Sequence, residues 1–342
     1  MGDSRVTAVV VNYRSGDDLN RCLPGVLAAG VGLTRVVVFD NDSGDESWRH
    51  VETLAESDNR VEIVLSKVNL GLAGAVNQIL PTVTTDYLAV LNPDSTPLDG
   101  WLPPLVAALD SNAEAGAACP LVLVEESGDV NSAGQHVHVT GLGFNRLLHA
   151  RPDDVGSDPH LVGGLHGVAF LIRTGLLREL GGWDQTGFLY HEDVALSWDL
   201  LLSGHDIVCV PTSRVLHDYH LTMYPEKLYL LERNRWALLL SHLRLGRLLL
   251  LSPALLLTEV MVWALAVVRG MGFLRAKARA YGWVWGQRGA IAAWRVRVFA
   301  RGSYDATRLR RATRWSYPIL QLGVLGGERG QSSRQPPGGL PV

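Results

Sequence analysis

Two short polar clusters carry side chains suited to chemistry on a charged substrate. The first, Asn92, Pro93 and Asp94, follows the apolar run YLAVL at residues 87–91. A Mg²⁺ or Mn²⁺ ion that bridges a diphosphate needs hard oxygen ligands on a fixed turn, and Asp94 and Asn92 offer a carboxylate and an amide oxygen two residues apart. Because the same triplet is also typical of a plain type I turn, its place in the fold decides between the two interpretations.

The second cluster, YHED at residues 190–193, ends a loop and starts an apolar helical pattern. Asp193, beside Glu192, could take the proton of an acceptor hydroxyl as a general base. Alternatively, Asp193 caps the helix expected over residues 194–203. His217, just past the last expected strand, is either a metal ligand or a structural histidine.

Further polar side chains follow the other expected strands and could hold a nucleoside, a sugar and a diphosphate. They are Tyr13 after the first strand, Asp40 and Asn41 after the second, and Asn69, Gly71 and Asn77 around the start of a helix. A small residue at a helix N-terminus lets a phosphate approach free N–H groups. A packed ring at Tyr13, and turn or helix caps at the others, are the competing interpretations.

The predicted strands and helices support a functional interpretation of these clusters, because they would bring the clusters to one edge of a sheet. Apolar, β-branched runs at residues 5–11, 35–39, 61–65 and 87–91 alternate with helical patterns at 17–29, 46–57 and 72–80. This order predicts an α/β fold with a parallel sheet covered by helices on both faces. Ligands of such sheets bind beyond the carboxyl ends of the strands, and the clusters follow strand ends. Residues 125–159 are polar and glycine-rich, which predicts loops or a short hairpin over the site.

The charge of the chain divides sharply. Residues 1–226 hold 12 Lys and Arg against 30 Asp and Glu, whereas residues 227–342 hold 19 against 4. A basic half can meet nucleic acid or an anionic membrane, and the long apolar runs in this half favour the membrane. We therefore expect a catalytic domain at 1–225, a basic, helical, membrane-associated region at 226–320 and a disordered tail at 321–342. Three cysteines without a CxxC pair indicate a reduced compartment.

Residues 248–268 form an apolar stretch whose only charge is Glu259 and which contains Pro253. Its length permits a transmembrane helix. Arginines flank it on both sides, so the positive-inside rule assigns no orientation. An interfacial or re-entrant hairpin, a single span and an ordinary buried helix pair all stay open.

Six motifs, in this order, resemble glycosyltransferase family 2 and within it the rhamnosyltransferase-type branch of bacterial envelope glycan synthesis. They are NYRSG (12–16), VVVFDNDSGD (36–45), NLGLAGAVNQ (69–78), LNPDSTP (91–97), LGGWDQTGFLYHEDVALSWDL (180–200) and VLHDYH (215–220). YLLERNRW (229–236) and FLRAKARAY (273–281) are similar to membrane-associated actinobacterial members. The resemblance implies a GT-A nucleotide-diphospho-sugar transferase fold and an inverting single displacement.

The resemblance also assigns roles. It implies that the nucleoside is held by Tyr13, Asp40 and Asn41, and that the sugar and diphosphate lie near Asn69, Gly71 and Asn77. It further implies that Mg²⁺ or Mn²⁺ is bound by Asn92, Asp94 and His217, and that the general base is Asp193, beside Glu192. The chain departs from the family pattern at Asn92, where relatives often have Asp, and at Ala195 and Asp199, where they have an acid and an arginine. His220 competes with His217 for the late ligand position.

The implied reaction moves rhamnose from deoxythymidine-diphosphate-rhamnose to a hydroxyl of a polyprenyl-linked glycan acceptor, at the cytoplasmic face of the cell membrane, in cell-envelope polysaccharide synthesis. A galactofuranosyl donor is the alternative, as is a non-catalytic, membrane-tethered protein that binds a nucleotide-sugar. A sugar-nucleotide pyrophosphorylase should carry a glycine-rich, basic loop after the first strand, and NYRSGDD (12–18) matches that poorly.

Overall fold

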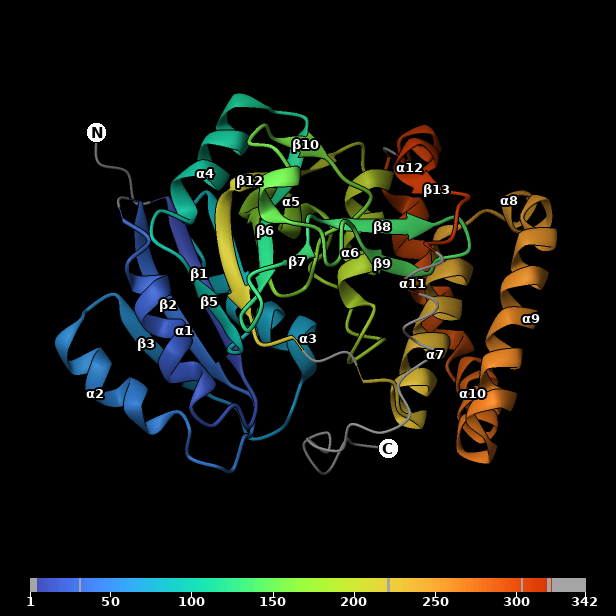
Figure 1. Ribbon diagram of the computed structural model, residues 1–342, viewed down its shortest axis with the longest axis horizontal. Helices are drawn as coiled ribbons and strands as arrows, with labels where there is room; N and C mark the ends of the chain where they lie inside the picture. The colour runs from blue at the N-terminus through green and yellow to red at the C-terminus, as the bar shows by residue number, and fades with distance from the viewer. Residues whose placement is uncertain (1–4, 31, 220–221, 303, 319–320, 322–342) are drawn as a thin grey trace.

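A mixed β-sheet forms the centre of the computed structural model, which describes residues 5–30, 32–219, 222–302, 304–318 and 321 (Figure 1). In the described part of the chain the strand order is β10-β12-β6-β11-β4-β1-β2-β3, with β5 on β12 and β7 on β6. The strands are β1 (Val6–Asn12), β2 (Leu33–Asp40), β3 (Val61–Leu65), β4 (Tyr87–Leu91), β5 (Ser95–Pro97), β6 (Ala115–Val124), β7 (Val130–Ser132), β10 (His160–Leu161), β11 (Ala169–Arg173) and β12 (Asp206–His217).

Strands β1 to β4 pair in parallel, as their alternation with helices predicts. Every residue of β1 is buried, because helices cover both faces of the sheet. Helices α1 (Asp18–Leu27), α2 (Arg49–Ser57) and α4 (Leu102–Ser111) pack on one face. Helices α3 (Gly71–Ile79), α5 (Thr174–Glu179) and α6 (Glu192–Leu202) pack on the other. Short 3-10 helices cover residues 80–82 and 152–154.

Strand β11 makes the sheet mixed, because it runs antiparallel between β4 and β6. Its N-terminal end therefore lies at the edge where β1, β2 and β4 end. The backbone N–H of Asn92 donates to the carbonyl of Val168 across 2.9 Å. The loop before β11 thus reaches the same edge as the polar clusters.

The glycine-rich segment at 125–159 contributes to a small second sheet. Strands β8 (Gln135–His138) and β9 (Gly143–Asn145) pair as a hairpin, and β13 (Thr313–Arg314) joins β8 in parallel. β13 comes from the far end of the chain, so the C-terminal region returns to the domain that carries the main sheet. Sequence periodicity indicates the hairpin but contains no signal for this third strand.

Two helices begin at other residues than the pattern predicts. α2 begins at Arg49 rather than at residue 46, since Asp42 and Glu46 have left-handed backbones with φ of 63° and 58°. α6 begins at Glu192 after a left-handed His191, φ 71°. Asp193 therefore lies inside the first turn of α6 and is not its N-cap.

The C-terminal region is helical, with α7 (Pro225–His242), α8 (Leu245–Leu250), α9 (Ser252–Arg269), α10 (Met271–Gly286), α11 (Arg288–Ala300) and α12 (Ala306–Ala312). Figure 1 shows α8 and α9 at the end of the molecule opposite β3. The expected disordered tail lies outside the described residues except for Gln321.

The apolar stretch at 248–268 is broken at Leu251, and Pro253 stands in the first turn of α9. Among the described residues α9 is the one helix long and apolar enough to cross a membrane. Only Leu255, Thr258 and Ala266 of α9 are buried, and the exposed large side chains include Leu256, Leu257, Val260, Val267 and Val268.

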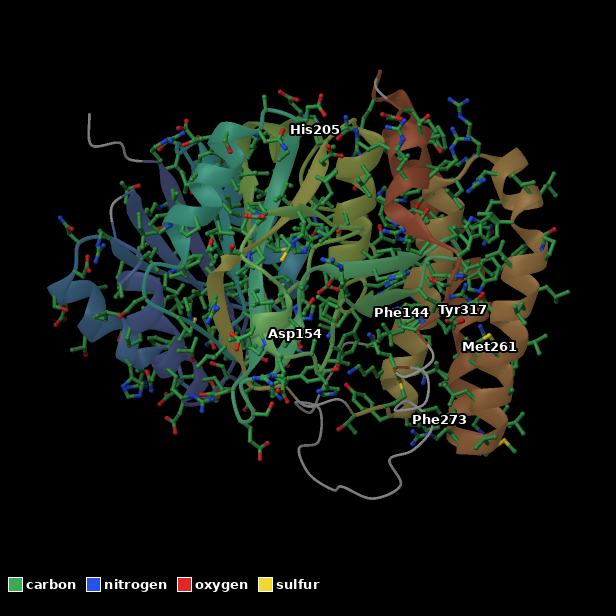
Figure 2. The ribbon with its side chains drawn as sticks, turned by 45° about the horizontal axis from the view of Figure 1, so that its top comes forward. Phe144, Asp154, His205, Met261, Phe273 and Tyr317 are labelled. Atoms are coloured by element: carbon green, nitrogen blue, oxygen red, sulfur yellow. The ribbon has the colours of Figure 1, made fainter. Side chains whose placement is uncertain are left out.

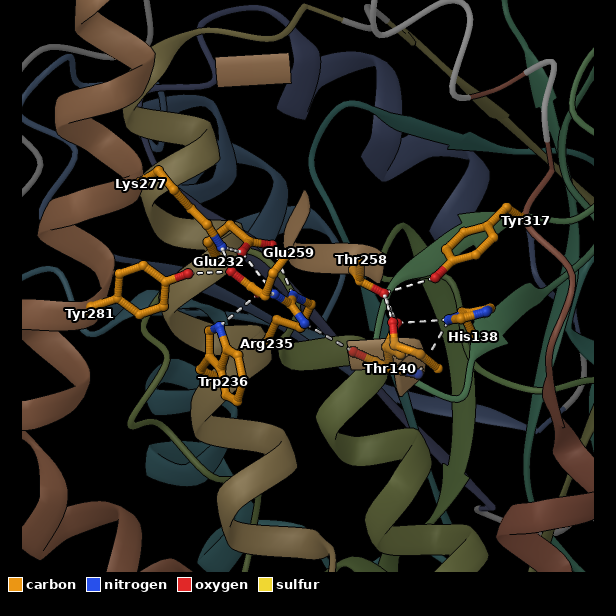
Figure 3. A network of polar contacts seen from close by, with 11 residues as sticks. His138, Thr140, Glu232, Arg235, Trp236, Thr258, Glu259, Lys277, Tyr281 and Tyr317 are labelled. Atoms are coloured by element: carbon orange, nitrogen blue, oxygen red, sulfur yellow. Dashed lines mark hydrogen bonds and ion pairs between the residues drawn. The ribbon is translucent and has the colours of Figure 1, made fainter. Parts of the chain in front are cut away.

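Glu259, the one charge of α9's apolar stretch, points into the protein (Figure 3). Its carboxylate pairs with Arg235 of α7 and, at 2.8 Å, with Lys277 of α10. Glu232 of α7 pairs with the same two cations, 2.8 Å from Arg235 Nε. Tyr281 and Trp236 also donate to Glu259. This buried charge cluster joins the three helices and fixes which face of α9 is exposed.

Candidate active site

Pairing of β5 with β12 brings the Asn92–Pro93–Asp94 turn to His217, since Ser95 lies opposite His217 in the ladder. Asp94 Oδ2 lies 3.5 Å from His217 Nε2. The backbone of Asn92 fixes the turn, because its carbonyl accepts from Ser95 Oγ across 2.6 Å. Two residues far apart in sequence thus form one polar pair at the carboxyl edge of the sheet.

Asn131 of β7 orients His217. Its Oδ1 lies 3.0 Å from His217 Nδ1. An amide oxygen only accepts, so Nδ1 is the ring nitrogen that donates to Asn131, and Nε2 is the one that faces Asp94. This is the arrangement that a histidine ligand of a metal requires. Sequence reasoning missed Asn131, which lies in the segment expected to be loops.

The pair fits a divalent cation in its donor chemistry. Asp94 Oδ1 is buried without a hydrogen-bond partner, and Nε2 of His217, which faces Asp94, is the ring nitrogen that Asn131 does not contact. Within the part of the chain that the structure describes, no group of three or more His, Cys, Asp or Glu is arranged to hold a metal ion. A cation held by this pair would need further ligands from outside these two residues. The competing ligand His220 lies outside the described residues.

His166, which sequence reasoning did not select, lies next to this pair. Its ring is buried, 6.0 Å from the His217 ring between centroids, and its Nδ1 has no hydrogen-bond partner. Burial, together with the neighbouring His217, lowers the pKa of His166 to about 3. The imidazole is therefore neutral at physiological pH.

Asp193 is held at the start of α6 by three donors. Its Oδ2 accepts from Gln135 Nε2 at 2.7 Å and from the Gly167 backbone N–H at 3.1 Å, and its Oδ1 accepts from the Val194 N–H at 2.8 Å. Gly167 directly follows His166, so Asp193 is fixed beside the same edge as Asp94. Gln135, on β8, is a further residue that sequence reasoning missed.

Burial changes the acidity of the two adjacent carboxyls, Glu192 and Asp193. It raises the pKa of Asp193 to about 6, against which the three hydrogen bonds act. Burial also raises the pKa of Glu192, and the Asp193 charge raises it further. Glu192 Oε2 has no hydrogen-bond partner. At neutral pH Asp193 is therefore the carboxylate able to accept a proton.

The loop at residues 69–71 is held from two sides. Asn41 Oδ1 accepts from the Leu70 N–H at 2.7 Å, and Asn69 Oδ1 accepts from the Gly71 N–H at 2.9 Å. Gly71 has φ of 71°, and a Cβ there would lie 2.4 Å from the carbonyl oxygen of Phe188. Only glycine fits, so this loop and the loop before α6 are in direct contact.

The ends of β1 and β2 form a buried polar turn. Asn12 Nδ2 donates to Asp40 Oδ1 at 2.7 Å, and Asp40 Oδ2 accepts from the Ser43 N–H at 3.1 Å. Tyr13 follows this turn and is only partly buried, with the Arg14 guanidinium 5.2 Å from its ring centroid. Asp40 thus shapes the turn, while Tyr13 leaves ring surface exposed.

Asn77 links the two loops of the site. It donates to the Trp183 carbonyl at 2.6 Å and accepts from the Trp183 N–H at 2.8 Å. The Trp183 indole in turn donates to the Glu192 carbonyl at 2.9 Å. The helix after Gly71 is therefore connected by hydrogen bonds to the start of α6.

The departures at Ala195 and Asp199 have a structural account. Asp199 is buried and pairs with Arg301 and with His242 Nε2 at 3.3 Å. Ala195 is buried as well. Both residues face the protein interior, and Asp199 fastens α6 to the C-terminal region.

The family model for glycosyl transferase family 2 matches residues 7–181. This chain belongs to glycosyltransferase family 2. The matched segment carries the strand-end clusters up to Gly181, and the carboxylates of α6 follow it. The family resemblance of the motifs is thereby confirmed.

Similar curated proteins include two from Mycobacterium tuberculosis. An N-acetylglucosaminyl-diphospho-decaprenol L-rhamnosyltransferase is 27% identical over 231 residues, which is 61% of this glycosyltransferase and 74% of the relative. A pre-mycofactocin glycosyltransferase is 28% identical over 215 residues, 63% of this chain and 43% of the relative.

Solved structures share the GT-A fold. GalNAc-T7 with UDP, GalNAc and Mn²⁺ superposes with a TM-score of 0.58 at 20% identity over 69% of this glycosyltransferase, which spans about half (48%) of that chain. A mannosyltransferase from Pyrobaculum calidifontis, in complex with GDP-Man and Mn²⁺, superposes with a TM-score of 0.54 at 17% identity over 90% of both chains. The predicted α/β GT-A fold with a C-terminal helical region is thus confirmed.

Proposed function

We propose that this glycosyltransferase transfers a sugar, with inversion, from a nucleoside-diphosphate donor to a hydroxyl of a lipid-linked glycan acceptor at the cytoplasmic face of the membrane. Deoxythymidine-diphosphate-rhamnose is the donor we favour, with rhamnose as the transferred sugar, because one relative is a rhamnosyltransferase. The observation that carries the proposal is the Asp193 carboxylate, fixed by Gln135 and Gly167 beside the Asp94–His217 pair.

Asp193 acts as the general base. Its carboxylate takes the proton of the acceptor hydroxyl, the hydroxyl oxygen forms the new bond to the anomeric carbon, and the bond from that carbon to the diphosphate oxygen breaks. The nucleoside diphosphate leaves with the bonding electron pair. Attack and departure on opposite faces invert the anomeric centre.

Asp94, His217 and Asn92 would hold Mg²⁺ or Mn²⁺ at the diphosphate end of the donor. A bound divalent cation supplies positive charge to the developing diphosphate. Asn131 keeps the His217 ring in place for this task. We assign Tyr13, Asp40 and Asn41 to the nucleoside, and Asn69, Gly71 and Asn77 to the sugar and diphosphate. The hydrogen bonds of Asp40, Asn41, Asn69 and Asn77 support this assignment because they order the loops concerned.

Membrane association belongs to the proposal through α9. Its exposed apolar face and the aromatic and arginine residues of α10 and α11 suit the headgroup layer. Because Glu259 is tied to α7 and α10, we propose that α9 lies on the membrane surface and does not cross it.

A donor screen tests the proposal. Binding of deoxythymidine-diphosphate-rhamnose, a galactofuranosyl donor and other nucleotide-sugars is measured by calorimetry with Mn²⁺ and after its removal, and the product's anomeric configuration is read by NMR. We expect metal-dependent binding of the rhamnosyl donor and an inverted product. Tight binding without transfer to any lipid-linked acceptor would establish the non-catalytic alternative.

A further inference from the structure

A cavity of about 500 Å³ lies between β9, α7 and α9. Its lining is mostly apolar and includes Phe144, Leu228, Leu231, Met261 and Leu265. Two of these residues, Phe144 of β9 and Met261 of α9, are labelled in Figure 2. Cavities of this size, roughly 300–1,000 Å³ with apolar walls and few polar groups, are typical of sites for small molecules. We call it the α7–α9 cavity.

The α7–α9 cavity shares its wall with the candidate active site at two points. His191, which directly precedes Glu192 and Asp193, lines it. Tyr219 lines it as well, and the Tyr219 ring lies 5.8 Å from the His217 ring between centroids. A molecule in the cavity would therefore lie against neighbours of the proposed base and of a proposed metal ligand. The acceptor, and not the donor nucleoside near β1 and β2, belongs on this side.

Lys227 supplies positive charge at the wall of the cavity. Its ammonium lies 5.2 Å from the centroid of the Tyr190 ring, and no carboxylate in the described part of the chain pairs with it. Burial lowers its pKa, and no neighbouring charge opposes this. By contrast, the other charged lining residues, Glu232 and Arg235, neutralise each other (Figure 3). Lys227 is thus the charged lining residue for which the described part of the chain offers no carboxylate, and a bound phosphate would supply the negative charge that favours its protonated form.

Helix α9 separates the cavity from the apolar surface of the protein. Thr258, Met261 and Leu265 face the cavity, whereas Leu257, Val260 and Val268 are exposed on the other side. A cavity of about 500 Å³ holds only the first part of a long isoprenoid chain. The remainder would leave along a helix that is apolar on both faces.

We propose that the α7–α9 cavity binds the phosphate-proximal isoprene units of the acceptor's polyprenyl chain, with Lys227 against the phosphate. This inference rests on the proposed function and names the part of the acceptor that the protein holds. In this arrangement a free hydroxyl of the sugar that the phosphate carries would be placed at Asp193.

The test uses the full-length protein in detergent with farnesyl diphosphate carrying a diazirine on its last isoprene unit. We expect photocrosslinks on the cavity-facing residues of α7 and α9, and competition by unlabelled farnesyl diphosphate but not by inorganic diphosphate. Leu231→Trp fills the cavity and should weaken crosslinking by at least about tenfold. Leu161→Trp, on exposed β10, is the matched control and should leave it unchanged.

Transfer assays separate the cavity from the catalytic site. Leu231→Trp should raise KM for a polyprenyl-linked acceptor at least about tenfold while leaving transfer to the same sugar on a short, water-soluble chain unchanged. Both acceptors carry the sugar on a phosphate, so Lys227→Gln should raise KM for both. This variant tests the inference if Leu231→Trp does not fold. The inference would be overturned by equal effects of Leu231→Trp on both acceptors, or by crosslinks confined to residues outside the cavity. In either case, transfer by the wild type would still uphold the proposed function. Crosslinking in the cavity without transfer by the wild type overturns the proposed function alone.

Discussion

The side-chain amide of Gln135 donates to Asp193 Oδ2 across 2.7 Å, although the two residues come from a small hairpin and from a helix 58 positions later. A hydrogen bond to the charged form of a carboxyl favours ionisation, whereas burial opposes it. Gln135 therefore helps keep Asp193 ionised at the pH where a base is needed, and several expectations about the site depend on this contact.

Replacement of Asp193 by Asn should abolish transfer while the donor still binds. General-base catalysis typically contributes about 10²–10⁴-fold, and the amide keeps the size of the side chain. We expect kcat to fall by at least about 10²-fold with donor affinity changed less than about threefold, measured by product formation and calorimetry. Asp154→Asn, on an exposed turn, is the control, and unchanged turnover in Asp193→Asn would refute the base assignment.

The pH profile of transfer should follow the raised pKa of Asp193, about 6. The base must be deprotonated, so kcat should decline as pH falls below about 6, where free aspartate, at about 3.9, would still be ionised. Gln135→Leu removes a hydrogen bond to the charged form, so the pKa should rise and the acid limb should move to higher pH. A limb that stays in place in this variant would show that Gln135 does not act through Asp193.

Removal of the divalent cation should stop transfer. EDTA should abolish activity and excess Mn²⁺ should restore it. Asp94→Asn and His217→Ala should weaken activation by Mn²⁺, and Asn131→Leu should do so by about 10–100-fold, because it frees the His217 ring. Titration of activity against Mn²⁺ concentration measures all three, and full activity of wild type in EDTA would contradict the metal role.

Replacement of Glu259 by Gln should destabilise the C-terminal region. Arg235 and Lys277 would keep a single buried carboxylate, Glu232, and breaking a buried pair typically costs about 3–5 kcal/mol. Thermal unfolding should show a clear loss of Tm, whereas Glu56→Gln, exposed on α2, should leave Tm unchanged. An unaltered Tm in Glu259→Gln would mean that α9 is held by apolar packing alone.

The exposed face of α9 should bind anionic vesicles. Leu256→Asp combined with Val260→Asp places two charges on that face, each opposed to apolar burial and to anionic headgroups. Flotation with phosphatidylglycerol vesicles should show binding by the wild type and loss in the double variant, with donor affinity unchanged. Val68→Asp, exposed on the opposite part of the molecule, should float like wild type.

The parallel part of the sheet could be predicted because its strands are continuous β-branched runs that alternate with helices. Residues 6–11 illustrate this, since a strand buried on both faces has no charged position and only β-branched or small side chains. The strand-end clusters at Asp40, Asn92 and His217 could be found for the same reason: polar residues stand out directly after apolar runs.

Residues that reach the site through tertiary contacts could not be predicted. Asn131, Gln135 and His166 lie in short or irregular segments without periodicity, and their role depends on where β7, β8 and the loop before β11 pack. The helix starts at Arg49 and Glu192 could not be predicted either. Left-handed backbones precede them at Glu46 and His191, and neither residue is a glycine, which is the usual sequence signal for that conformation.

The buried charges around Glu259 have a consequence for the reach of the enzyme. Arg235 of α7 pairs with Glu259 of α9 and donates to the Thr140 carbonyl, in the turn between β8 and β9, at 3.2 Å. The exposed apolar side chains of α9 are therefore fixed in position relative to the hairpin whose Gln135 holds Asp193. With α9 on the membrane surface as proposed, Asp193 would stand at a fixed distance from the bilayer. Sugars at one distance from the lipid would meet the base, and those added later would pass out of its range.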